Sequence, residues 1–161
     1  MKLPDLFIFI DEVEDNDPEW KEAGPALLYW CVAVPTWKLA IVHRRLKEVV
    51  KAPRDFHAKD DYKLKSPNLD LMRNLSDLII TRKLDCLCFP FFKGWLKSPR
   101  LHAINEVEFT NRKLNPENYR DVGFYFLAHY LNWYVPRYLY FQATMRLVAD
   151  RKRFELSING S

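Results

Sequence analysis

The chain opens on a continuous run of hydrophobic residues that ends in acids. Residues 6–10 are five apolar side chains in a row, and four of the five residues at 11–15 are acidic. An uninterrupted apolar run is typical of a strand covered on both faces, as at the centre of a parallel or mixed sheet. A second apolar run, residues 26–34, ends at Pro35. The pattern therefore begins with two buried strands.

Beyond Pro35 the apolar spacing changes to three or four residues, which predicts helices that alternate with further strands. The predicted helices are 37–51, 69–83, a short one around 101–109, and 116–140 with a kink near Pro136. The predicted strands are 85–92 and 142–151. Pro90 cannot donate to a ladder, which favours an edge position for the first of these. The alternation predicts an α/β fold, a mixed sheet flanked by helices, in a single domain spanning residues 1–161.

The composition narrows the possible functions only slightly. The net charge of +4 permits a nucleic-acid partner without requiring one. With four glycines in 161 residues, the chain contains no glycine-rich phosphate-binding fingerprint. The three cysteines lie in apolar runs, so we expect them to be buried and reduced. A serine or cysteine nucleophile is therefore not favoured.

Nothing in the pattern indicates a membrane protein. The most apolar long segment, residues 122–141, contains His129 and Arg137, which argue against a membrane span. At the beginning of the chain, Pro4 and Asp5 interrupt any signal-peptide core. We therefore expect a cytoplasmic protein.

Acids at the ends of predicted strands, together with one histidine, are the candidate catalytic groups. Asp11 and Glu12 follow the first apolar run, and Asp150 falls near the end of the last predicted strand. Such carboxylates can converge at one rim of a sheet and bind Mg²⁺ or Mn²⁺, the ions that assist phosphoryl displacement. On this interpretation Asp11 and Asp150 are metal ligands, Glu12 completes the site, and His57 is a further ligand or a general acid. The alternative is that these groups are simply solvated.

Two helices have surfaces that suggest a partner. The helix at 37–51 is strongly basic, and its cations either form a solvated outer face or bind a phosphate backbone. The candidate nucleic-acid-binding residues are Lys38, Arg44, Arg45 and Lys47. The helix at 116–140 is rich in aromatic residues, which is more typical of a core combined with a dimer face than of a base-stacking platform.

Residues 7–12, Phe-Ile-Phe-Ile-Asp-Glu, resemble the opening of a family of bacterial and phage domains of unknown function. The signature of that family is a hydrophobic strand followed by Asp-Glu-Ser-Gly, and its fold is similar to ribonuclease H. Residues 56–60 resemble the short histidine-containing motif of the family, and residues 147–151 resemble its later strand. The resemblance implies a ribonuclease H-like fold, with Asp11 as a metal ligand.

The same resemblance implies roles for His57 and Asp150, and it leaves two functions open. The chain departs from the pattern because Val13-Glu14 replaces Ser-Gly, the strand at 85–92 ends in aromatic residues, and no closing acidic helix is expected before Ser161. One expectation is a nuclease, a phosphodiesterase dependent on Mg²⁺ or Mn²⁺, in a phage or mobile-element setting. The other is a non-catalytic protein of the same fold that binds a protein partner or forms a homodimer through the aromatic helix 116–140.

Overall fold

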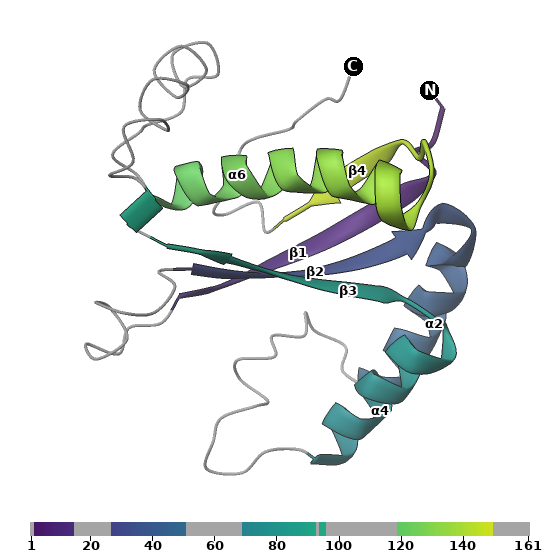
Figure 1. Ribbon diagram of the computed structural model, residues 1–161. Coiled ribbons are helices and arrows are strands. Elements are labelled where there is room, and N and C mark those ends of the chain that lie inside the picture. The colour runs from purple at the N-terminus through teal and green to yellow at the C-terminus, as the bar shows by residue number, and fades with distance from the viewer. Residues whose placement is uncertain (1, 15–26, 51–68, 93, 96–118, 150–161) are drawn as a thin grey trace.

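The computed structural model describes residues 2–14, 27–50, 69–92, 94–95 and 119–149, and Figure 1 shows how their helices and strands are arranged. In chain order these elements are β1 (Leu6–Glu14), β2 (Leu27–Pro35), the 3-10 turn η1 (Thr36–Lys38), α2 (Leu39–Val50), α4 (Leu69–Thr81), β3 (Asp85–Phe91), α6 (Tyr119–Tyr134), the π-helical turn η3 (Val135–Leu139) and β4 (Met145–Val148). The predicted short helix around 101–109 lies outside the described residues.

The described strands form one mixed sheet in the order β3-β2-β1-β4. β1 and β2 are antiparallel, β2 and β3 are antiparallel, and β4 lies parallel to β1. The first strand is therefore central, and β3 is an edge strand of the described sheet, as Pro90 predicts. The prediction of an α/β fold, in which helices flank a mixed sheet, is confirmed.

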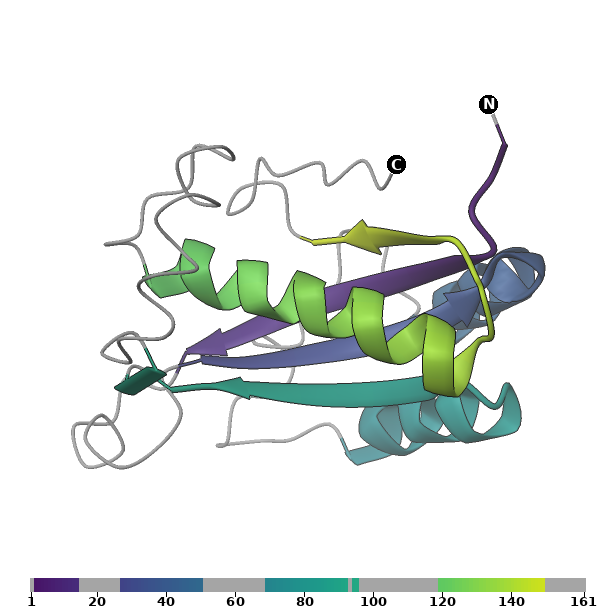
Figure 2. The ribbon, with the colours of Figure 1, turned by 45° about the horizontal axis from the view of Figure 1, so that its top comes forward.

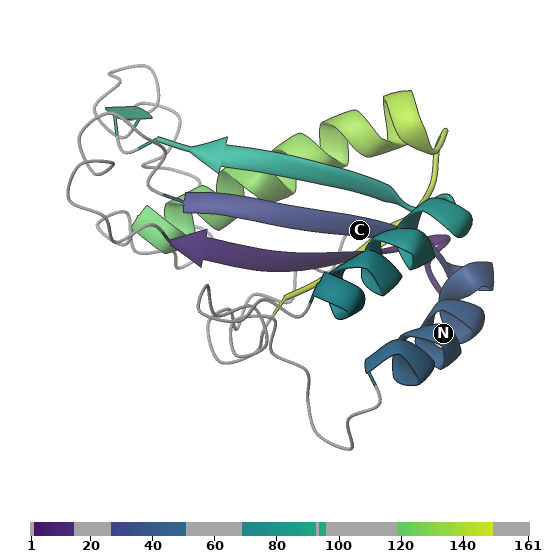
Figure 3. The same cartoon turned by 90° about the horizontal axis from the view of Figure 1, so that it is seen from below.

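The two faces of the sheet are covered unequally. α6 lies along one face and crosses the strands obliquely (Figure 2). α2 and α4 lie on the other side, near the end of the sheet where β1 begins and β2 ends (Figures 1 and 3). The main core therefore forms between the sheet and α6.

Burial alternates along β1 even though its hydrophobicity does not. Leu6, Ile8 and Ile10 face the core and are buried, whereas Phe9, 38% exposed, and Val13 lie on the opposite face. The expectation that both faces of this strand are covered is therefore wrong, because Phe9 and Val13 remain exposed on the second side. We call this second side the open face; its exposed residues include Phe9, Asp11, Val13, Trp30, Cys86 and Cys88.

α6 approaches β2 very closely at Gly123. A Cβ atom at this position would lie 2.7 Å from the Tyr29 hydroxyl oxygen and 3.2 Å from carbon atoms of Leu27 and Phe91. All three side chains are fully buried, so they have little room to move. The distance between helix and sheet therefore depends on glycine at this position.

Pro136, where a kink is predicted, lies in a π-helical turn. α6 continues directly into η3, in which the backbone N–H of Tyr140 donates to the carbonyl of Val135 at 2.8 Å. Proline has no N–H and its ring crowds the preceding turn, so a locally wider helix accommodates it. Just after this turn, the Tyr140 hydroxyl donates to Asp85 Oδ2 at 2.6 Å and so connects the end of the helix to the start of β3.

The beginning of β1 is tied to the residue that precedes β4 by a group of bonds that we call the Asp5–Thr144 clasp. The backbone N–H and hydroxyl of Thr144 donate to Asp5 Oδ2 at 2.9 and 2.8 Å, and the Asp5 N–H donates to the Thr144 carbonyl at 3.0 Å. These bonds lower the pKa of Asp5. Thr36 extends the clasp, because its N–H donates to the Asp5 carbonyl at 2.9 Å and its hydroxyl donates to the carbonyl of Pro4.

Candidate functional site

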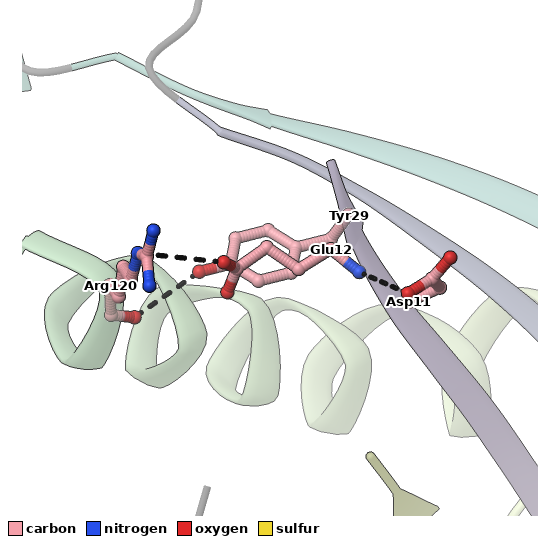
Figure 4. Close-up of polar contacts among 4 residues, drawn as sticks. All are labelled: Asp11, Glu12, Tyr29 and Arg120. Carbon is pink, nitrogen blue, oxygen red and sulfur yellow. Dashed lines mark hydrogen bonds and ion pairs between the residues drawn. The ribbon is translucent and has the colours of Figure 1, made fainter. Parts of the chain in front are cut away.

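Asp11 lies within β1 rather than beyond its end, and its side chain is exposed on the open face. The backbone N–H of Glu12 donates to Asp11 Oδ1 at 3.0 Å, which orients the carboxylate (Figure 4). In the antiparallel pairing Asp11 stands directly opposite Trp30, which in turn stands opposite Cys88 on β3. We call these three residues the Asp11 row.

Glu12 points to the other side of the sheet. Its side chain is only 3% exposed, and Arg120 Nε of α6 lies 3.7 Å from its Oε1 atom (Figure 4). The same turn of α6 accepts a hydrogen bond from the Tyr29 hydroxyl, at 3.2 Å, through the Arg120 carbonyl. Glu12 therefore connects β1 to the first turn of α6, and the structure does not bring its carboxylate together with that of Asp11.

The other two predicted site residues, His57 and Asp150, lie outside the described residues. Within the described ranges, no three His, Cys, Asp or Glu side chains come close enough together to hold a metal ion. The last described pair of the parallel ladder joins Phe9 of β1 to Val148 of β4. Asp11 is two residues beyond that pair on β1.

The four basic residues singled out from the sequence have different surroundings. Lys38 Nζ donates to the carbonyls of Arg82 and Lys83 at 2.7 and 3.3 Å, so it caps the C-terminal end of α4. Arg45 forms an exposed ion pair with Glu48, at 2.7 Å. The remaining two, Arg44 and Lys47, line a shallow hollow of about 490 Å³ beside α2.

The three cysteines are not alike, contrary to the expectation that all are buried. Cys31 lies in the core, where burial raises the pKa of its thiol to about 12. Cys86 and Cys88 are exposed, because alternate residues of the edge strand β3 lie on the open face. Partial loss of solvent contact, with a contribution from Asp85, also raises the pKa of the Cys86 thiol. The buried Cys31 thiol is therefore a poor nucleophile.

Sequence reasoning missed Trp30, the half-exposed neighbour of Asp11. The run at 26–34 is apolar at nearly every position, so hydrophobicity alone does not separate Trp30 from its buried neighbours Tyr29 and Cys31. Only the strand register places Trp30 opposite Asp11. Arg120 was missed for a similar reason, since its partner Glu12 is distant in sequence.

The exposed side of α6 and η3 has a continuous group of aromatic rings, which we call the α6 aromatic surface; its members are Tyr130, Trp133, Tyr134 and Tyr138. The rings of Tyr130 and Tyr134 stack with centroids 5.3 Å apart and planes 11° apart, and Tyr134 lies 5.3 Å from Tyr138. Trp133 and Tyr138 are 48% and 62% exposed. The guanidinium of Arg137 lies over the Trp133 ring, 5.9 Å from its centroid.

Comparison with known protein families, with curated proteins and with solved structures finds no match for this chain. Among the described helices, none has the length and apolar character needed to cross a membrane.

Proposed function

We propose that the chain is a divalent-metal-dependent phosphodiesterase that acts on nucleic acid, with Asp11 as a metal ligand. The observation that carries the proposal is the exposed Asp11 carboxylate on a central strand. Its neighbours on the open face by sequence and register, Phe9, Val13 and Trp30, are apolar. A hard oxygen donor held by a rigid strand is the kind of ligand that Mg²⁺ and Mn²⁺ prefer.

The parallel ladder between β1 and β4 supports Asp150 as the second ligand. Asp11 is two residues beyond Phe9, and in the sequence Asp150 is two residues beyond Val148, the residue paired with Phe9. β4 ends at Val148 and Asp150 lies outside the described residues, so its place beside Asp11 is part of the proposal. The described residues contribute one carboxylate to this set, and His57 remains a proposed general acid or further ligand.

The topology supports a ribonuclease H-like fold for this enzyme. β1, β2 and β3 pair in antiparallel fashion, with α2 and α4 inserted between β2 and β3; α6 follows β3, and β4 then joins the sheet parallel to β1. A mixed sheet of this kind, with a helix along one face, is what the resemblance of residues 7–12 implies. In such a fold the first strand is central and presents the metal-binding carboxylate.

Cations on the same side of the sheet as Asp11 support nucleic acid as the substrate. α2 lies on the side of the open face (Figures 1 and 3), and the exposed side chains of Arg44 and Lys47 are available for phosphate contacts. Lys38 and Arg45 are less suited to this role, since one caps α4 and the other is paired with Glu48.

The first test is whether Mg²⁺ or Mn²⁺ binds through Asp11. At a metal concentration ten times the dissociation constant, we expect about 1.4 kcal/mol of stabilisation and a rise in Tm of roughly 3–6 °C. Asp11→Asn should remove this rise, together with any metal-dependent cleavage of labelled DNA or RNA. Asp77→Asn, which alters an exposed carboxylate on α4, is the matched control and should retain both.

Three results would contradict the nuclease proposal. One is the absence of a thermal shift with either ion. Another is the absence of cleavage of single-stranded and double-stranded DNA and RNA. The third is a shift and a cleavage rate that are identical in wild type and Asp11→Asn, because Asp11 would then have no part in the site.

The α6 aromatic surface favours a second candidate function, a protein that self-associates or binds a protein partner. Large aromatic side chains exposed side by side are typical of interfaces, where they contribute contact area at a low cost in conformational entropy. The exposed fractions of Trp133 and Tyr138 support this candidate. It does not depend on Asp11, so variants on the two faces of the sheet distinguish the two functions.

A further inference from the structure

We propose that the Asp11 row binds single-stranded nucleic acid, with the indole of Trp30 stacked on an unpaired base beside the Asp11 carboxylate. The inference deepens the proposed nuclease function and rests on it only for the chemistry at Asp11. The base-binding role of Trp30 depends on the geometry of the open face alone.

Trp30 is a large side chain that does not pack in the core. It lies within β2, and its neighbours Tyr29 and Cys31 are the residues that enter the core on the other face. The Trp30 side chain is 50% exposed on the open face. Phe9 and Val13 are exposed on the same face, so Trp30 is part of a group of exposed apolar side chains around Asp11, and such groups are typical of binding sites.

The strand register places this ring next to the candidate metal ligand. Asp11 and Trp30 are directly opposite residues of an antiparallel pair, and the Cβ atoms of such residues lie about 4.5–5.5 Å apart. A nucleotide whose base covers the indole therefore has its own sugar and phosphate within reach of the Asp11 carboxylate. Phe9, two residues before Asp11 on the same strand and face and 38% exposed, offers a second ring next to that carboxylate.

Stacking of this kind selects single strands over duplexes. In a double helix each base is covered above and below by its neighbours, so no base face is free for an indole. Unpaired bases expose their faces, and proteins that bind single strands combine aromatic residues with a positively charged track. Arg44 and Lys47 of α2 are exposed cations on the same side of the sheet, toward the end where β1 begins, so a bound strand would reach them by running along the open face from Trp30.

The test is metal-free binding, because stacking needs no cation and EDTA prevents metal-dependent cleavage. Fluorescence anisotropy would measure the dissociation constants of labelled single-stranded DNA, single-stranded RNA and a duplex of the same sequence, at low salt. We expect Trp30→Leu to weaken single-strand binding about tenfold or more, the usual effect of losing one stacked base. Trp30→Phe should lose less than about threefold, since a ring is retained.

Trp37→Leu is the matched control. Trp37 is 80% exposed, but it lies in η1, at the end of the sheet where Leu6 pairs with Pro35, far along the strands from the Asp11 row. Single-strand binding should be unchanged in this variant. Leu and Phe at position 30 both keep an apolar side chain on the open face. A difference in dissociation constant between the two variants therefore reports the aromatic ring, and thermal melts check that both variants are folded.

Each outcome decides between the two proposals. If wild type binds no single strand, or if Trp30→Leu and Trp30→Phe bind equally well, the stacking role is overturned. Cleavage that depends on Asp11 but not on Trp30 would leave the nuclease proposal standing without it. Single-strand binding that depends on Trp30, without any metal-dependent cleavage, would support the stacking role and reject the nuclease.

Discussion

Asp11 and Glu12 are neighbours in sequence, but a single step along β1 gives them different chemistry. Asp11 is exposed, whereas the Glu12 carboxylate is buried within 3.7 Å of Arg120. Removing one partner of a buried ion pair is costly because the other charge remains out of water. Glu12 therefore helps to hold β1 against α6. The described side-chain contacts of Asp11 join it to no other element.

Gly123 is the residue at which the packing of α6 is most easily tested. In Gly123→Ala, the new methyl group would lie 2.7 Å from the Tyr29 hydroxyl oxygen. Overpacking costs about 1–3 kcal/mol, and the better helix propensity of alanine offsets up to about 1 kcal/mol of it. We expect urea denaturation to show a free energy of unfolding lower by about 1–2 kcal/mol.

Gly94→Ala provides a control for this substitution, because no atom lies within 4 Å of a Cβ built at Gly94. Its effect should stay within about 0.5 kcal/mol. In a Tyr29→Phe background the nearest contact is removed, so Gly123→Ala should cost less there than in wild type. An equal cost in the two backgrounds would show that the hydroxyl is not the obstacle.

At the scale of elements, the bond from Tyr140 to Asp85 connects η3 to β3 and makes stability depend on pH. Burial, followed by this hydrogen bond, raises the pKa of Tyr140 to about 12. An unfolded tyrosine titrates near pH 10, so between these values the folded chain binds more protons than the unfolded chain. The stabilisation is therefore fully present below about pH 10 and is lost as pH rises through about 12.

We expect the Tm of wild type to fall between pH 9 and 11.5 by more than that of Tyr140→Phe, which has no phenolic proton to lose. Cys31, whose thiol pKa is also raised to about 12, contributes to the fall in both proteins, so the difference between them reports Tyr140. Melts followed by circular dichroism measure both changes. Parallel curves for the two proteins would show that Tyr140 does not titrate differently in the folded and unfolded states.

The order and type of the described elements could be predicted from hydrophobic spacing, but the exposure of their faces could not. The strand at 6–10 and the edge position of β3 in the described sheet follow from local residue chemistry, and both are confirmed. A run that is apolar at every position contains no signal for which face is inside. The alternation along β1 arises from α6, which is distant in sequence; Arg120 and Glu12, for example, are 108 positions apart.

The candidate site was predictable to a smaller extent, because it depends on register. The sequence identifies Asp11 and Glu12 as a pair of acids, and only the strand geometry separates them onto opposite faces. Likewise, Trp30 and Cys88 become neighbours of Asp11 through pairings between strands that are distant in sequence. The predicted roles of His57 and Asp150 concern residues outside the described ranges and stay predictions.

At the scale of the whole molecule, the α6 aromatic surface gives a prediction about oligomeric state. If this surface mediates self-association, light scattering should show a mass that rises with concentration, and Trp133→Glu should return the protein to a monomer because a charge would be buried in the interface. Trp37→Glu, which places the same charge at a site away from α6, should not. A wild type that is monomeric at every concentration would reject self-association.

The Asp5–Thr144 clasp has a consequence for how the chain reaches this structure. It joins residues 139 positions apart in a chain of 161, and the parallel strand β4 beside it spans a similar separation. Contacts between residues so distant in sequence close a very long loop. The entropy cost of closing it is offset only after the intervening elements have packed. The pairings of β1 with β2 and of β2 with β3 span far fewer residues, at most 29 and 64 positions. We therefore expect β4 to pair with β1 late in folding, after β3 has paired with β2 at the other edge of the described sheet.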